Sequence, residues 1–359
     1  MTEQEMRTSS RAKVVKVTGM TEAQAVMTLG PASTHPNEFV SKEFRDDVTF
    51  RGVQPMHLSE AEEGAVRIAY EEKFRDAFAL LRRFTAENLP ITDIAFLATT
   101  KCMELNPANY TLWVYRRRCL KELGMDLEKE LEATRELAEN NSKNYQIWHH
   151  RKTILEILTQ ENEEVKKRAF ENELEFLDTV LGNDPKNYHA WQHRQWLVNS
   201  FKKDGLESEV AFADSLIKED VRNNSAWNYR FNVVSWSDPK MDSIDENVIA
   251  REIQYTCEKI QQCPNNESSW NYLRGIMELN SDVREQILQF CKAEYLKDCP
   301  FALSCMVDIH LEHIEDRKDV GENKKEALEI LGRLRSLDYI RENYWNYMTY
   351  KVENESSKT

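Results

Sequence analysis

The sequence predicts an all-α fold, a right-handed α-α superhelix (solenoid) of about seven helical hairpins that together form a crescent. Three observations support this prediction. A tryptophan-centred motif recurs, mostly at intervals of 35 to 43 residues, and the apolar residues between its copies follow a helical period. Glycine and proline are scarce, at 10 and 9 of 359 residues. Sheets need many tight turns, so this scarcity favours long helices with short connections.

The recurring motif is Asn-x-x-x-Trp-x-x-Arg. Four copies are intact, and a fifth carries its arginine, Arg274, one position late. A sixth copy keeps only Trp345 and its neighbours, and the gap of 75 residues from Trp270 to Trp345 predicts a degenerate repeat near Phe301–His313. The five motif tryptophans are Trp113, Trp148, Trp191, Trp227 and Trp270, and the four in-register arginines are Arg116, Arg151, Arg194 and Arg230.

Each motif predicts the start of the second helix of a hairpin. Asparagine is a favoured N-cap, because its side-chain oxygen accepts a hydrogen bond from an otherwise unpaired backbone N–H. The capping positions are Asn109, Asn144, Asn187, Asn223 and Asn266. A residue that recurs in every unit is expected to serve the capping or stacking that every unit requires, so we interpret the motif tryptophans and arginines as structural. We expect the arginines to bridge adjacent hairpins through carboxylates or aromatic faces.

The remaining organisation is simple. Residues 1–42 show little periodicity and predict a disordered N-terminal tail, residues 43–350 form the repeat domain, and 351–359 form a polar C-terminal tail. The net charge of −14 argues against general nucleic-acid binding. No run approaches the ~18 apolar residues of a membrane span. The seven cysteines include no CxxC pair, which favours reduced thiols and a cytoplasmic location.

No motif in the chain indicates a metal or nucleotide site. Cys299, Cys305, His310 and His313 match no standard zinc spacing, so we expect no metal on this chain and place the two histidines on a helix surface. Phosphate-binding loops and hydrolase motifs are also missing from the sequence. By its own chemistry, the chain is more typical of a scaffold than of an enzyme.

Residues that differ between repeats indicate where function lies. Lysines directly precede two of the capping asparagines, and tyrosines directly follow three of them. Stacking of hairpins would place equivalent positions along one edge, where helix N-termini carry partial positive charge, and this edge would suit a phosphate or diphosphate. The alternative is that the lysines are solvated loop residues. The residues of this edge are Lys143, Lys186, Tyr110, Tyr145, Tyr188, Gln146 and His189.

The motif resembles the repeat of protein prenyltransferase α subunits. The segments Lys143–Arg151 and Lys186–Trp196 look like the α subunit shared by protein farnesyltransferase and geranylgeranyltransferase type I, and Tyr70–Asp76 and Ile340–Tyr347 add further matches. Two alternatives stay open. The Rab geranylgeranyltransferase α subunit shares the repeat but often carries extra domains, for which this chain has no room. A non-catalytic scaffold of TPR type would show a different signature and a strict period of about 34 residues.

The resemblance implies a heterodimer in which this chain, inactive alone, wraps around a β subunit. The β subunit would hold the catalytic Zn²⁺ and set the isoprenoid length, and Mg²⁺ would accompany the diphosphate. The reaction would transfer a farnesyl or geranylgeranyl group from its diphosphate to the cysteine of C-terminal CaaX proteins. The resemblance also implies residue roles. Lys143, Tyr145 and His189 would be catalytic, Gln146, Tyr110 and Tyr188 would bind substrate, and Lys186 would be peripheral.

Overall fold

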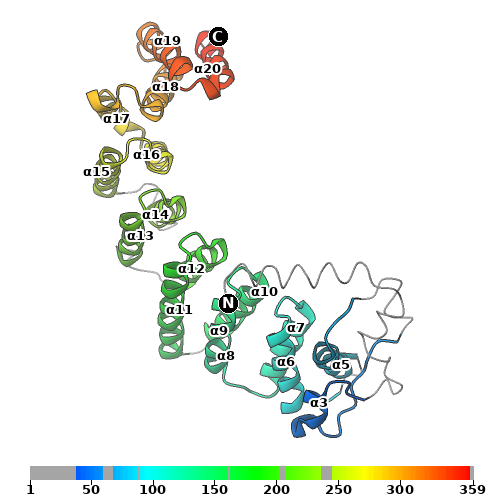
Figure 1. The fold of residues 1–359 in the computed structure, drawn as a ribbon. Helices are drawn as coiled ribbons and strands as arrows, with labels where there is room; N and C mark the ends of the chain where they lie inside the picture. The colour runs from blue at the N-terminus through cyan, green and yellow to red at the C-terminus, as the bar shows by residue number, and fades with distance from the viewer. Residues whose placement is uncertain are drawn as a thin grey trace, which may run out of the picture. The chain divides into compact units, whose positions relative to one another are not determined.

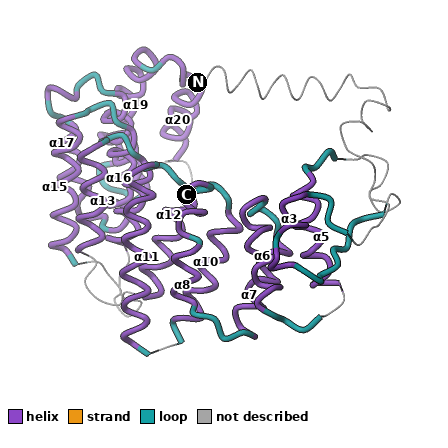
Figure 2. The backbone as a smooth tube through the Cα atoms, turned by 60° about the horizontal axis from the view of Figure 1, so that its bottom comes forward, coloured by secondary structure: helices purple, strands orange, loops and turns teal. Residues whose placement is uncertain are grey.

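The computed structural model describes residues 38–59, 68–86, 89–160, 162–201, 207–235 and 245–355. Every regular element within these ranges is a helix, as Figure 2 shows. The predicted all-α fold of repeated helical hairpins is therefore confirmed. The chain divides into two compact units, residues 1–169 and 170–359, which we describe separately. Most of the predicted N-terminal tail, and residues 356–359 of the C-terminal tail, lie outside the described residues.

Within the described residues, the first unit contains helix α5 followed by two hairpins, and in Figure 1 α5, α6 and α7 lie side by side. Its first hairpin pairs α6 with α7. In the second hairpin, the first helix is broken into α8 and α9, and both pieces pack on α10. The helices are α3 (Lys42–Asp46), the 3-10 turn η1 (Val48–Phe50), α5 (Glu72–Ala86), α6 (Asp93–Leu105), α7 (Tyr110–Glu122), α8 (Leu127–Ala133), α9 (Arg135–Asn140) and α10 (Tyr145–Leu158).

One buried carboxylate holds the beginning of the described chain against α5. Asp76 accepts hydrogen bonds from the backbone N–H groups of Val40 (3.0 Å) and Ser41 (2.7 Å). His57 Nε2 lies 3.2 Å from the same carboxylate. These bonds lower the pKa of Asp76 although burial opposes its ionisation, so Asp76 is an anionic anchor for residues 38–57.

The second unit continues the same pattern, and its hairpins pair α13 with α14 and α15 with α16. The boundary between the units falls within α11 (Glu163–Asn183). The remaining elements are α12 (Tyr188–Phe201), α13 (Glu207–Glu219), α14 (Asn224–Ser235), α15 (Glu246–Gln262), α16 (Glu267–Leu279), η2 (Ser281–Val283), α17 (Arg284–Cys291), η3 (Glu294–Leu296), α18 (Pro300–Glu315), α19 (Val320–Leu337), η4 (Tyr339–Arg341) and α20 (Glu342–Glu355).

Helix α18 is the predicted degenerate repeat. Cys299 stands at its N-cap, where the five motif repeats carry asparagine, and no side-chain capping bond forms there. The buried Leu303 stands four positions later, where the motif has tryptophan. Among the described elements, the order from α6–α7 to α19–α20 gives seven hairpins, which agrees with the prediction of about seven, when α8 and α9 are counted as one broken helix.

All five motif asparagines cap their helices, which confirms that prediction. Their side-chain oxygens accept backbone N–H groups at 3.0–3.3 Å. Two of the side-chain amide nitrogens also donate hydrogen bonds to backbone carbonyl groups, which the sequence did not reveal. Asn223 Nδ2 donates to Pro185 O at 3.1 Å, and Asn266 Nδ2 donates to Val221 O at 2.7 Å. In these two repeats the cap therefore also ties its helix to the turn of the preceding repeat.

Each motif tryptophan closes its own turn. The indole N–H donates to the carbonyl oxygen six residues earlier, at 2.7–2.9 Å in all five repeats. The ring itself is buried, with exposures from 0% at Trp270 to 8% at Trp191. A buried indole N–H without a partner would cost free energy, so this bond lets a large apolar ring occupy the core.

A buried glutamate links consecutive repeats. Glu130 receives both Nε (2.6 Å) and Nη2 (2.8 Å) of Arg116 from the preceding hairpin, and it lies 2.9 Å from His150 Nε2 in its own hairpin. The second unit repeats this arrangement. Arg194 binds Glu209, which accepts the Tyr229 hydroxyl, and Arg230 binds Glu252, which accepts the Tyr272 hydroxyl.

Three of the motif arginines thus make the carboxylate contacts expected of them, and they also stack on aromatic rings. Arg116 lies 4.1 Å from the Phe96 centroid, Arg194 lies 3.5 Å from Phe212, and Arg230 lies 3.8 Å from Tyr255. The fourth, Arg151, donates to Leu131 O (2.6 Å) and to Thr134 Oγ1 (3.0 Å).

The placement of His310 on a helix surface is wrong. The side chain is 2% exposed, and its Nδ1 lies 2.7 Å from Asn323 Oδ1 while its Nε2 lies 3.2 Å from Glu326 Oε2. Helix α18 is covered by α19, which supplies both partners. The sequence argument failed because a polar side chain can be buried where a neighbouring helix supplies a hydrogen-bond partner to one ring nitrogen and places a carboxylate near the other.

Candidate functional site

Three successive second helices begin with an exposed tyrosine. Tyr110, Tyr145 and Tyr188 are the first residues of α7, α10 and α12, directly after the capping asparagines. Their side chains are 64%, 52% and 71% exposed. The first turns of these helices contain no acidic residue, whereas α16 carries Glu267 there. The partial positive charge of these three N-termini is therefore left uncompensated by the helices themselves.

In the first unit, the structure brings Tyr110 and Tyr145 together. The Tyr145 hydroxyl donates to the Tyr110 hydroxyl at 3.2 Å, and the ring centroids lie 6.5 Å apart. This hydrogen bond, with a small contribution from burial, raises the pKa of Tyr145. Tyr145 therefore stays protonated near neutral pH, and a phenolic hydroxyl is a hydrogen-bond donor that suits an anion.

Lys143 and Gln146 flank the same helix start. Lys143 is exposed in the turn before α10, and Asn144 separates it from Tyr145. Gln146 is half-buried, and its backbone N–H donates to the Asn144 side chain at 3.0 Å. The N-terminus of α10 therefore collects an ammonium group, a phenol and a carboxamide within four consecutive residues.

The second unit holds the other predicted site residues. Tyr188 and His189 open α12 with their rings edge to face, 5.7 Å apart between centroids. Lys186 is exposed, and its ammonium group lies 3.4 Å from the Asp220 carboxylate. The Lys186 ammonium group therefore has an anionic partner within the chain. The sequence alone did not reveal this pairing, because the two residues lie 34 positions apart.

Chemically, the start of α10 suits an anion with several oxygens. Backbone N–H groups, a lysine and phenolic hydroxyls are the donors that proteins use for phosphate groups. The described residues contain no group of three or more His, Cys, Asp or Glu side chains placed to hold a metal ion. Nor is any helix in the described part of the chain long and apolar enough to cross a membrane.

Comparison with known proteins agrees with this architecture. Five segments match the family model described as "Protein prenyltransferase alpha subunit repeat": residues 94–123, 127–158, 170–201, 206–237 and 249–280. Each segment covers one hairpin with its motif tryptophan. The fold and the repeat thus define the class of the molecule, a helical-repeat protein of the prenyltransferase α-subunit type.

Relatives that match most of the chain narrow this class. The chain is 32% identical over 309 residues to the protein farnesyltransferase/geranylgeranyltransferase type-1 subunit alpha of Dictyostelium discoideum, covering 82% of this chain and 89% of the relative. The Candida albicans protein of the same name is 31% identical over 320 residues, covering 84% and 97%. This chain therefore belongs to the family of protein farnesyltransferase/geranylgeranyltransferase type-1 α subunits.

A solved structure supports the assignment. A chain of the Candida albicans protein geranylgeranyltransferase-I complexed with GGPP is similar to this chain with a TM-score of 0.72 and 29% sequence identity. The similarity covers 83% of this chain and 96% of that chain.

Proposed function

We propose that this chain is the α subunit of a heterodimer that transfers a farnesyl or geranylgeranyl group from its diphosphate to the cysteine thiol of C-terminal CaaX proteins. The observation that supports this most directly is the acid-free N-terminus of α10, where the Lys143 ammonium group and the Tyr145 hydroxyl lie within three residues of each other. The bond between the isoprenoid carbon and the diphosphate oxygen breaks as the bond between carbon and sulfur forms. Negative charge then grows on the departing diphosphate, and cationic donors stabilise it.

In this proposal, Lys143, Tyr145 and His189 contact the diphosphate, and Gln146 binds the terminal carboxylate of the protein substrate. Tyr110 and Tyr188 contribute to the substrate-binding edge. The partner β subunit would supply Zn²⁺ to lower the thiol pKa, and Mg²⁺ would accompany the diphosphate. The chain alone would be inactive. The seven cysteines in the structure are unpaired thiols, which suits the reducing cytoplasm.

The test is co-expression with candidate farnesyltransferase and geranylgeranyltransferase type I β subunits, followed by single-turnover transfer to a CaaX peptide. Lys143→Ala should slow the chemical step about 10- to 150-fold, which corresponds to one charge-assisted contact of roughly 1.5–3 kcal/mol. Lys186→Ala is the matched control, because it removes a lysine that also directly precedes a capping asparagine and that we expect to be peripheral to the site, and it should stay near the wild-type rate.

Heterodimer formation, measured by size-exclusion chromatography, should be unchanged in both variants because the two lysines are exposed. Wild-type single-turnover rates in the Lys143 variant would remove this residue from the mechanism. Transfer to Rab proteins with an escort protein, in place of CaaX peptides, would overturn the substrate assignment.

A further inference from the structure

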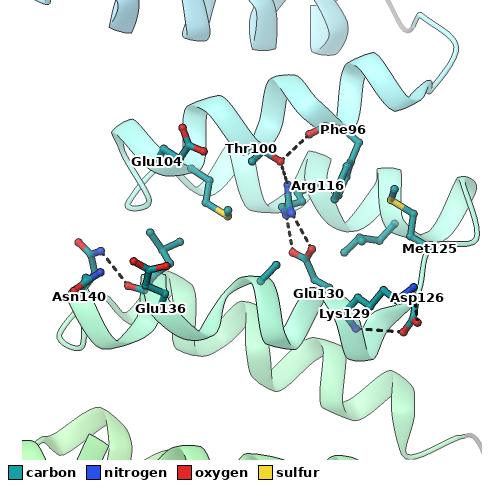
Figure 3. A pocket seen from close by; sticks show the side chains of 15 residues that line it. Phe96, Thr100, Glu104, Arg116, Met125, Asp126, Lys129, Glu130, Glu136 and Asn140 are labelled. Carbon is teal, nitrogen blue, oxygen red and sulfur yellow. Dashed lines mark hydrogen bonds and ion pairs between the residues drawn. The ribbon is translucent and has the colours of Figure 1, made fainter. Parts of the chain in front are cut away.

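The first unit carries a hollow that the proposed reaction does not use. It has a volume of about 660 Å³ and lies between the hairpin α6–α7 and the broken helix α8–α9, as Figure 3 shows. Phe96 and Met103 line it from α6, Leu120 from α7, and Leu137 from α9. Much of the lining is therefore apolar.

The hollow lies along a break that is particular to this repeat. Thr134 separates α8 from α9, whereas α13 and α15, the corresponding first helices in the second unit, are continuous. Arg151 donates to Leu131 O and to Thr134 Oγ1 at the break, and a side chain inserted into the helical bonding pattern is a known cause of kinks. The broken helix contributes Ala133 and Leu137 to the lining.

The charges of the hollow are not balanced. At its base, Arg116 and Glu130 satisfy each other, and Arg116 also donates to Thr100 Oγ1 at 2.9 Å (Figure 3). Lys129 lies 3.7 Å from Asp126. Glu104 and Glu136 remain, both exposed, and neither has an ion-pair partner within the part of the chain that the structure describes. The mouth of the hollow is thus apolar and negatively charged, and it suits a segment that combines cations with aliphatic side chains.

We propose that residues 7–17 of this same chain dock in the hollow. This segment, from Arg7 to Val17, contains the four cations Arg7, Arg11, Lys13 and Lys16 and no acidic residue, in a chain whose net charge is −14. It also contains the three valines Val14, Val15 and Val17. The segment therefore complements the mouth of the hollow in two ways. Its aliphatic side chains fit the apolar lining, and its cations can pair with the two glutamates.

The connection is long enough for this contact. Residues 18–37 join the segment to the first described residue, Glu38, and 20 residues span up to roughly 65 Å when extended. A compact unit of this size has a radius of gyration of only about 15 Å, so any point on its surface is within reach. Tethering of this kind gives an effective concentration on the order of millimolar, so a weak contact suffices to populate the docked state.

Photo-crosslinking in the full-length chain, purified in its native assembly, tests the proposal. A p-benzoylphenylalanine at position 15 should crosslink to peptides from residues 96–104 and 125–141. Mixing isotopically light and heavy chains before irradiation separates a contact within one chain from a contact between copies. The double variant Glu104→Lys, Glu136→Lys should lower the crosslink yield about three- to tenfold, as expected for the loss of two exposed ion pairs.

The matched control is Glu139→Lys, which makes the same charge change at an exposed position of α9 that does not line the hollow. It should leave the yield unchanged. Reversing the four cations of the segment to glutamate should restore the yield in the double variant, which excludes misfolding as the cause of the loss. Crosslinks to another region of the chain, to a second copy or to another protein would overturn the proposal. A crosslink yield that is the same in the wild type and in all of these charge variants would also overturn it.

Discussion

At the residue scale, the buried Glu130 has its charge state fixed by its neighbours. Burial opposes its ionisation, but hydrogen bonds from His150 and Arg116 outweigh burial and hold the pKa of this carboxyl below its usual value. Burial lowers the pKa of His150 in spite of the neighbouring carboxylate, so His150 is neutral and donates to Glu130. The arrangement is an ionised glutamate between one arginine and one neutral histidine.

This arrangement predicts a pH dependence of stability. Because the folded His150 binds a proton less readily than the unfolded one, the unfolded state takes up more protons as pH falls below about 6.5, and stability should decline. Glu130 has a lowered folded pKa, so its contribution is present above about 4.5 and is lost in stronger acid. Urea unfolding between pH 7.5 and 5.5 measures the first effect.

Other repeats suggest a control variant for this prediction, because they carry tyrosine at the position of His150. Tyr229 and Tyr272 occupy the position of His150 in later repeats and donate a phenolic hydroxyl to the equivalent glutamate. His150→Tyr should therefore keep a donor and reduce the slope of stability against pH by up to about 1.4 kcal/mol per pH unit. Equal slopes in the wild type and the variant would show that other groups cause the dependence.

At the scale of one helix start, the capping asparagines use both ends of their amide. Asn223→Asp keeps the oxygen that caps α14 but loses the Nδ2–H bond to Pro185, and it places a carboxylate against that carbonyl. We expect a loss of about 1–3 kcal/mol in the free energy of unfolding, the cost of a buried acceptor and charge without a donor.

Asn109→Asp is the matched control, because Asn109 caps α7 and donates no side-chain bond to a preceding turn within the described residues. It should change stability by less than about 0.5 kcal/mol, since aspartate caps as well as asparagine does. Chemical denaturation of both variants compares them directly. Equal losses would show that the amide bonds between repeats contribute little.

Packing between helices gives a second prediction at this scale. A Cβ on Gly275 of α16 would lie 2.7 Å from Cε2 of Phe231 on α14, so Gly275→Ala must displace that ring. We expect a destabilisation of roughly 1–3 kcal/mol. Gly182→Ala in α11 meets nothing within 4 Å and should stabilise the helix by about 0.5–1 kcal/mol. Thermal melting distinguishes the two, and a stabilised Gly275 variant would contradict the close packing.

The sequence predicted the hairpins and their caps well, because both depend on local patterns around Asn and Trp. It did not predict the buried glutamates, because each one taken alone resembles a charged residue on the solvated face of a helix. Glu130, Glu173, Glu209 and Glu252 each stand 18 residues before a motif tryptophan, and that regularity is the signal that could have found them. The pairing of Lys186 with Asp220 and the burial of His310 depend on which helices meet in space, and neither follows from periodicity. The predicted roles of the site residues remain predictions.

At the scale of the whole molecule, each hairpin is bound mainly to its neighbours, as the glutamate bridges illustrate. Stability in such arrays is approximately a sum of local contributions. Glu252→Ala leaves Arg230 and Tyr272 without their partner, and it should destabilise the molecule by about 3–5 kcal/mol near the site. Hydrogen exchange should rise in α14, α15 and α16 and stay near wild type in α5 and α6. A uniform rise along the chain would indicate a single cooperative unit instead.

The partners of the glutamate bridges are separated by regular numbers of residues along the chain. From each bridging glutamate to the His or Tyr that binds it the distance is always 20 residues, as in Glu130 to His150 and Glu252 to Tyr272. From the preceding motif arginine to the glutamate the distance is 14 residues at Arg116 and 22 at Arg230. Differences in repeat length thus fall in the connections between successive hairpins, and the spacing within each hairpin stays constant. An epitope or fluorescent tag inserted between Ser235 and Asp245 should leave the array intact, whereas the same insert between Cys263 and Asn266 would shift a tryptophan and its bridge out of register.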